Sequence, residues 1–190
     1  SIMNLLIIGI VGGLFGSSFG TLLPVFADKI LNGDFQTYDN LLFSAGIGGA
    51  IGTLYIALFG RIQNSVSIHI ITCIILCAAL FIFSRLTWLP ASMLFLSLVG
   101  GSNSAFGTIN HSLLQVLVHD NFRGRVMSIQ QLSWGSTALG GLILGVLAQS
   151  VNATFSLAAS AIITLVITLW LILNSRTELQ KSINSLDRIK

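Results

Sequence analysis

One stretch of the chain places four hydrogen-bonding side chains at helical spacing. Ser104, Thr108, His111 and Gln115 recur at positions i, i+4, i+7 and i+11, so they share one face of a helix. These side chains donate and accept hydrogen bonds, which is the chemistry of holding a polar molecule rather than of breaking one of its bonds. We expect the face to border either a neighbouring helix or an aqueous cavity, and the density of polar groups favours the cavity.

Two shorter polar stripes of the same kind occur elsewhere in the chain. Ser17 and Thr21 are four residues apart near its start, and Gln130, Trp134 and Thr137 recur at i, i+4 and i+7 further on. We predict that all three stripes face a cavity, and its expected lining is Ser17, Thr21, Asn103, Ser104, Thr108, Asn110, His111, Gln115, Gln130 and Trp134.

Single reactive residues give weaker signals. His111 could titrate near neutral pH and take part in proton coupling, or it could be a histidine whose hydrogen bonds are satisfied near a helix end. We expect His69 at the membrane interface. Cys73 and Cys77 share a helix face, but no third ligand is near, so we expect packing thiols with no metal and no cofactor. No Asp or Glu lies in an apolar stretch, which argues against an enzyme.

The segment HDNFRGRVMS, residues 119–128, gathers three ions in a chain of which only 8% of residues are charged. Placing Asp120, Arg123 and Arg125 at the centre of a bilayer would cost roughly 8–10 kcal/mol. We therefore expect these side chains to lie in an aqueous loop.

Long charge-free intervals supply the elements that must carry the polar stripes. Apolar residues make up 54% of the 190 residues and the mean hydropathy is +0.90, which excludes a soluble globular fold. A helix crosses a bilayer with about 20 apolar residues, and the alternation of a barrel strand is not seen. The sequence therefore predicts an all-α polytopic membrane protein with six transmembrane helices near residues 3–26, 40–60, 66–84, 89–113, 127–148 and 154–174.

Basic residues are distributed unevenly between the two sides of this bundle. Two of them, Lys29 and Arg85, lie on one side. Seven lie on the other: Arg61, Arg123, Arg125, Arg176, Lys181, Arg188 and Lys190. The positive-inside rule places the second group, and both termini, in the cytoplasm. There is no basic surface with interleaved aromatic residues, so we expect no nucleic-acid partner.

The start of the chain suggests that the sequence is part of a longer protein. Ser1 stands without an initiator methionine and leads almost at once into an apolar helix, without a basic region followed by a cleavage site. We expect a preceding cytoplasmic segment and a further set of spans.

Residues 110–148, NHSLLQVLVHDNFRGRVMSIQQLSWGSTALGGLILGVLA, resemble the region between the tenth and eleventh helices of major facilitator superfamily exporters. The resemblance is to the branch that holds enterobactin and macrolide efflux proteins. In that branch an Asn, a Leu-Gln pair and an Asp precede an Arg-Gly-Arg-Val-Met-Ser run; here these are Asn110, Leu114 with Gln115, Asp120 and residues 123–128. The opening, LFGSSFGTLLPVFADKIL followed by LLFSAGIGGAIGTL, is similar to the seventh and eighth helices. His111 and His119 depart from the pattern.

The resemblance implies that this chain is the C-terminal half of a twelve-helix transporter in a bacterial inner membrane. Its partners would be the lipid bilayer, the missing N-terminal six-helix half, a small amphipathic substrate and protons. The polar stripes would then line the substrate cavity of a proton-coupled exporter that works by alternating access. Arg123 and Arg125 would anchor a cytoplasmic gate with Asp120, which would cap the next helix or pair with Arg123, and Arg61 would belong to a related loop motif.

Two alternatives stay open at this point. The chain could be a half-size, six-span membrane scaffold or a unit that pairs with itself, without transport activity. After the bundle of residues 1–175, the tail of residues 176–190 could form an amphipathic helix on the membrane surface or a frayed, solvated end.

Overall fold

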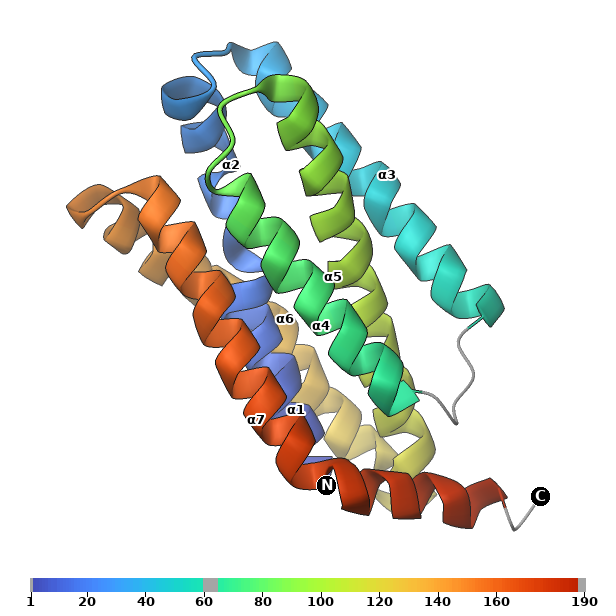
Figure 1. Cartoon of the computed structure of the whole chain (residues 1–190). Helices are drawn as coiled ribbons and strands as arrows, with labels where there is room; N and C mark the ends of the chain where they lie inside the picture. Colours follow the sequence, from blue (N-terminus) through green and yellow to red (C-terminus); the bar gives the residue numbers. More distant parts are fainter. Residues whose placement is uncertain (1, 60–64, 188–190) are drawn as a thin grey trace.

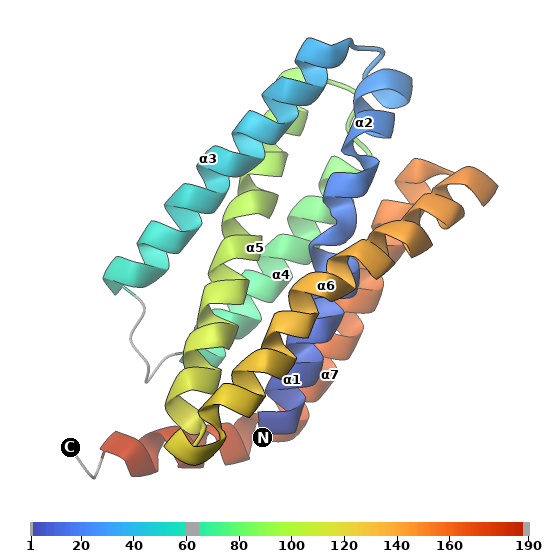
Figure 2. The ribbon, with the colours of Figure 1, turned by 180° about the vertical axis from the view of Figure 1, so that it is seen from behind.

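Long helices run alternately up and down along one axis (Figures 1 and 2). This computed structural model describes the backbone of residues 2–59 and 65–187, and the side chains of the same residues except 2, 65, 120, 133 and 175–187. After the first span the helices are α3 (Phe35–Phe59), α4 (Ser65–Phe83), α5 (Leu89–Leu117), α6 (Asp120–Ser150) and α7 (Ala153–Asp187). The N-terminus, the α5–α6 turn and the last part of α7 lie at one end of the bundle (Figure 1).

The first span is one helical segment whose pitch changes several times. Its parts are α1 (Ile2–Val11), a π-helical turn (Gly12–Gly16), a 3₁₀ segment (Ser18–Leu22), α2 (Leu23–Val25) and a second π-helical turn (Phe26–Ile30). The Ser17 N–H donates to the Gly12 carbonyl over 2.8 Å, five residues back rather than four. Pro24 has no N–H to continue the ladder. The expected helix over residues 3–26 therefore exists, but it is not a regular α-helix.

Short polar side chains set several helix boundaries. Asn32 has a left-handed backbone (φ 48°), and the Gly33 N–H donates to the Ala27 carbonyl, which closes the first span. Asp34 then caps α3, because its carboxylate accepts from the Thr37 N–H at 3.1 Å. The side chain of Asn152 accepts from the Thr154 N–H in the same way at the start of α7.

The charged segment expected to be a loop is helical instead. α6 begins at Asp120, so Arg123 and Arg125 lie in its first two turns. His119, with extended backbone, occupies the capping position that was expected for Asp120, whose side chain lies outside the described residues. The segment can be helical and hydrated at once because α6, at 31 residues, is longer than a bilayer core requires.

Among the described residues, five helices are long and apolar enough to cross a membrane: Met3–Ile30, Phe35–Phe59, Val66–Phe83, Asn121–Ser150 and Ala153–Asn174. α5 has 29 residues and extends four residues beyond the expected end at 113, but it is not among these five. Its Asn, Ser and His residues make its sequence less apolar than that of α3 and α4. The expected sixth span is therefore a long helix whose polar residues offset its apolar ones.

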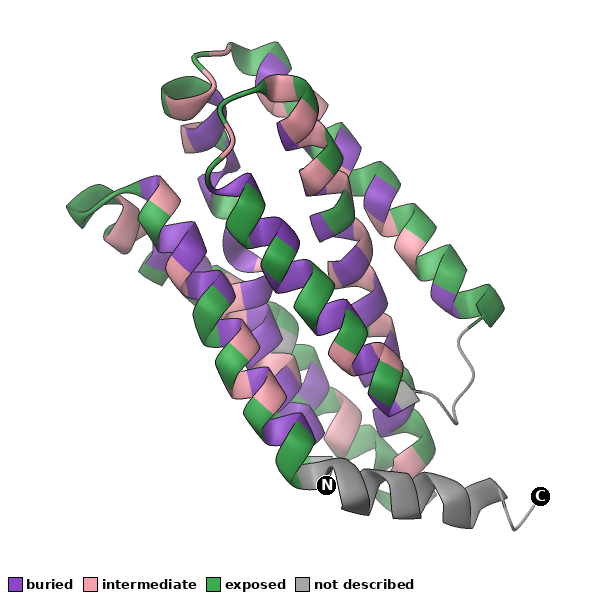
Figure 3. Ribbon diagram, in the orientation of Figure 1, coloured by how far each residue is buried: buried purple, intermediate pink, exposed green. Residues whose placement is uncertain are grey.

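The core lies where the first span, α4, α5 and α7 meet. Phe26 and Phe83 stack there with ring centroids 5.1 Å apart. His69 is also inside, 1% exposed, with its ring stacked on Phe106 at 4.4 Å, so the expected interfacial position is wrong. Figure 3 shows buried residues on the faces that these helices turn toward one another, and many exposed residues along α3. Large apolar side chains such as Leu58 point outward, as in proteins that lipid surrounds.

Candidate functional site

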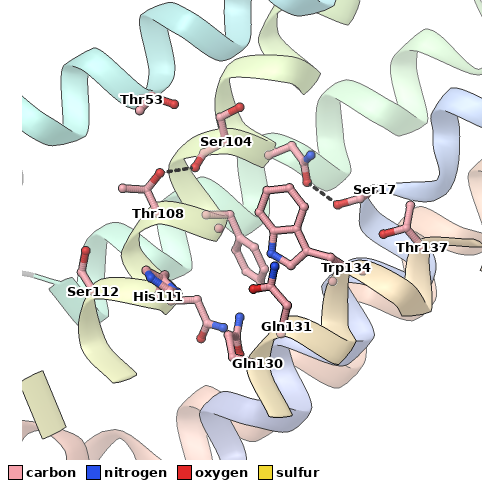
Figure 4. A pocket seen from close by; sticks show the side chains of 17 residues that line it. Ser17, Thr53, Ser104, Thr108, His111, Ser112, Gln130, Gln131, Trp134 and Thr137 are labelled. Carbon is pink, nitrogen blue, oxygen red and sulfur yellow. Dashed lines mark hydrogen bonds between the residues drawn. The ribbon is translucent and has the colours of Figure 1, made fainter. Parts of the chain in front are cut away.

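A cavity of about 600 Å³ opens between the first span, α5 and α6, with Thr53 of α3 on its border. Figure 4 shows Ser104, Thr108 and His111 along α5, and Gln130, Gln131 and Trp134 on α6. Of the ten residues expected to line a cavity, eight lie here together: Ser17, Asn103, Ser104, Thr108, Asn110, His111, Gln130 and Trp134.

Hydrogen bonds hold part of this lining in place. The Ser17 hydroxyl donates to Oδ1 of Asn103 at 3.0 Å, which joins the first span to α5 (Figure 4). The Thr108 hydroxyl donates to the Ser104 carbonyl at 2.8 Å within α5. This second bond satisfies the hydroxyl inside its own helix, so Thr108 can turn its methyl group toward the cavity.

The pitch changes of the first span help to shape the cavity wall. The Ser18 hydroxyl lies within hydrogen-bonding distance of three carbonyl oxygens, those of Gly13 (3.0 Å), Leu14 (2.7 Å) and, across the helix interface, Thr137 of α6 (3.0 Å), and its one proton is shared among them. The Ser136 hydroxyl donates to the Ile10 carbonyl at 3.2 Å in the opposite direction. These bonds compensate carbonyls where the regular ladder is interrupted and fix the first span against α6.

The described lining is polar without being charged. Among the residues that border the cavity none is Asp, Glu, Lys or Arg, and His111 is the titratable one. Phe106 and Trp134 supply aromatic surface. Such a lining suits a molecule with neutral hydrogen-bonding groups and an apolar part. In the part of the chain that the structure describes, no three His, Cys, Asp or Glu residues gather as a metal site requires.

Two of the expected residues, Thr21 and Gln115, do not border this cavity. Thr21 is exposed and its side chain lies against Gly141 of α6. The 3₁₀ segment Ser18–Leu22, which contains Thr21, advances by about 120° per residue and so rotates it away from the face that carries Ser17. The Gln115 amide nitrogen bonds Nε2 of His111 at 2.9 Å, one turn beyond the cavity.

The expected gate residues lie at the end of the bundle where α5 turns into α6. Arg123 Nη2 donates to the Gln115 carbonyl at 3.3 Å, and that carbonyl belongs to the last turn of α5. A guanidinium at this point satisfies a carbonyl that the helix cannot bond internally. Arg125 is exposed. Arg61 and the Asp120 side chain lie outside the described residues.

Sequence reasoning missed a glycine-lined part of the wall. Gly9, Gly12 and Gly13 border the cavity from the first span, as do Thr53, Phe106, Gly107, Ser112, Gln131 and Thr137 from other helices. Thr137 continues the polar stripe of Gln130 and Trp134, although it was not among the ten residues assigned to the cavity. The glycines carry no polar side chain, so a search for polar stripes does not find them.

A second, shallower hollow adjoins the cavity between α3 and α5. It measures about 700 Å³ and has largely small and apolar walls, such as Ala45, Gly46 and Ala50. Asn103 and Ser104 border both spaces. The two hollows are therefore continuous around the polar face of α5.

Comparison with known proteins adds three findings. The family model for transmembrane secretion effectors matches residues 1–189. The staphyloferrin A transporter of Staphylococcus aureus (strain NCTC 8325 / PS 47) is 26% identical over 156 residues, which are 81% of this chain and 38% of that protein. The major facilitator superfamily proton:xylose symporter XylE, solved with 6-bromo-6-deoxy-D-glucose, has the same fold: the TM-score is 0.62 at 18% identity, over 98% of this chain and 49% of the symporter. The chain thus spans less than half the length of both proteins.

Proposed function

The chain belongs to the transmembrane secretion effector family of the major facilitator superfamily, and from this premise we propose that it is the C-terminal six-helix half of a proton-coupled exporter. Its apolar helices and its family make it an integral membrane protein. The transported molecule is small and amphipathic, and the two halves of the full protein alternate access around the cavity between them.

The coverage of the symporter supports the half-transporter assignment. Nearly the whole chain, 98%, corresponds to 49% of a complete transporter of this fold. α5 counts as the sixth span, because its 29 residues exceed the about 20 that a bilayer crossing needs. It lies beside α3 and α4, which are themselves apolar enough to cross.

The observation that carries the proposal is the 600 Å³ cavity with an uncharged polar wall and two aromatic side chains. A pocket of this size encloses a drug-sized molecule. Arg123, on the carbonyl end of α5, contacts that helix from α6 at the end of the bundle that we assign to the cytoplasm, and would anchor the gate.

Gly107→Phe tests the cavity directly. A Cβ at Gly107 meets no atom within 4 Å, so the phenyl ring enters the cavity without disturbing the backbone. Gly145→Phe is the matched control, because a Cβ there is equally free and Gly145 does not border the cavity. Cells that express the full-length protein are loaded with the neutral amphipathic dye Nile red and energised.

We expect cells with the parent protein to export the dye and to lose this efflux when an uncoupler is added. Gly107→Phe should slow efflux at least tenfold, and Gly145→Phe should keep the parent rate. Arg123→Ala should slow efflux without preventing membrane insertion. Dye movement equal to that of cells without the protein would contradict an exporter. In that case cross-linking would show whether the chain pairs with itself.

A further inference from the structure

Two buried amides meet at one end of the cavity. Asn110 of α5 is 1% exposed and Gln130 of α6 is 6% exposed, and both border the cavity. Gly9 of α1 lies opposite them: a Cβ there would be 2.9 Å from Asn110 Nδ2 and 2.9 Å from Gln130 Oε1. Three helices therefore bring a donor and an acceptor to a space that a single methyl group would fill.

These amides have polar atoms without partners. Asn110 Nδ2, Asn110 Oδ1 and Gln130 Oε1 are buried and make no hydrogen bond with any described residue. A buried polar atom without a partner costs about 1–3 kcal/mol, and folded proteins carry few of them. Two of these atoms, Asn110 Nδ2 and Gln130 Oε1, lie together beside Gly9, and the third belongs to the same Asn110 amide. They indicate a place where a ligand completes the hydrogen bonds.

The free atoms select the chemistry of that ligand. A carboxylate only accepts hydrogen bonds, so Asn110 Oδ1 and Gln130 Oε1 would stay without donors and would face its negative charge. An ammonium only donates, and it would face the amide hydrogens of Asn110 with no counter-ion in the described lining. A neutral hydroxyl group both donates and accepts, so it can satisfy Asn110 Nδ2 and one of the two acceptor oxygens, and a primary amide, with two N–H donors, can satisfy all three atoms.

We propose that Gly9, Asn110 and Gln130 form a subsite that binds a neutral hydroxyl or amide group of the transported molecule. Its apolar part lies against Phe106 and Trp134, which border the same cavity. The subsite rests on the proposed function, since it specifies what the cavity recognises.

Three ligands with one tail and different head groups test this subsite. Decanamide, decanoate and decylamine are titrated at pH 7 into the full-length protein in nanodiscs. Trp88→Phe and Trp170→Phe remove two exposed tryptophans of this chain, so that Trp134, which is 76% exposed at the cavity, reports on binding there. Any tryptophan in the remainder of the protein is replaced in the same way.

In the parent protein we expect decanamide to bind at least tenfold more tightly than decanoate or decylamine. Asn110→Leu and Gln130→Met keep the approximate side-chain volume and remove the hydrogen-bonding atoms, so each should raise the Kd of decanamide at least tenfold and leave decanoate unchanged. Gly9→Ala should do the same by filling the space. Gly145→Ala, where a Cβ meets nothing, should bind as the parent does.

The outcomes separate the subsite from the cavity. If decanamide binds equally to the parent, Asn110→Leu, Gln130→Met and Gly9→Ala, while Gly107→Phe prevents binding, the subsite is wrong and the cavity stands. If Asn110→Leu lowers the melting temperature with an unchanged Kd, the two amides only hold α5 and α6 together, and the subsite is again wrong. If Gly107→Phe binds decanamide as the parent does, the proposed function fails as well.

Discussion

His69 is a buried polar residue that the cavity does not use. Its two ring nitrogens make no hydrogen bond with the described residues, and its ring stacks on Phe106. Burial without a partner costs about 1–3 kcal/mol, so His69→Leu should raise the melting temperature of the purified full-length protein in detergent. His111→Leu is the control, because His111 is exposed and bonded to Gln115, and it should give no such increase. A lower melting temperature for His69→Leu would show that the imidazole stabilises the core.

At the scale of one element, the interrupted first span depends on a close approach by α6. A Cβ at Gly140 would overlap the Leu14 carbonyl oxygen and the Ser18 hydroxyl. Gly140→Ala should therefore push α6 away and destabilise the protein by about 1–3 kcal/mol, seen as a lower melting temperature. Gly135→Ala, in the same helix with open space around a Cβ, should be neutral. Equal melting temperatures for the two variants would mean that the interface relaxes without loss.

How far sequence reasoning reached also differs between elements. Spacing alone placed Ser104, Thr108 and His111 on one wall, because α5 is a regular helix and its periodicity holds along its length. The same reasoning does not hold at Thr21, because this residue lies within a 3₁₀ segment rather than a regular α-helix. Periodicity cannot anticipate a change of pitch. It also cannot show that Gly48 packs on the Ser97 carbonyl, since this contact joins two separate helices.

At the scale of the whole molecule, the direction in which the bundle lies in the membrane is a prediction from charge. Arg123 and Arg125 lie at the end that carries the N-terminus, and Arg85 lies between α4 and α5 at the other. The positive-inside rule turns the first end to the cytoplasm. His119→Cys and Asn152→Cys place a thiol at each end, at exposed positions.

In intact cells, an impermeant maleimide should label Asn152→Cys and should reach His119→Cys only after permeabilisation. The control is the full-length protein without an added cysteine, in which any reactive thiol outside this chain has been replaced. It should stay unlabelled, because Cys73 and Cys77 are buried. The reverse labelling pattern would invert the orientation.

The sequence of α5 has a consequence for how the protein is made. This helix carries much of the cavity's polar wall, and for that reason it is less apolar than α3 and α4, which precede it. Each Asn or His at the centre of a span makes release from the translocon into lipid less favourable. Contacts with α3, where Gly52 packs on the Gly101 backbone, replace lipid along one face of α5. During synthesis α5 therefore has to pack against helices that are already in the membrane when it leaves the translocon. α3 and α4 precede α5 in the chain, so they are made first and are available for this packing.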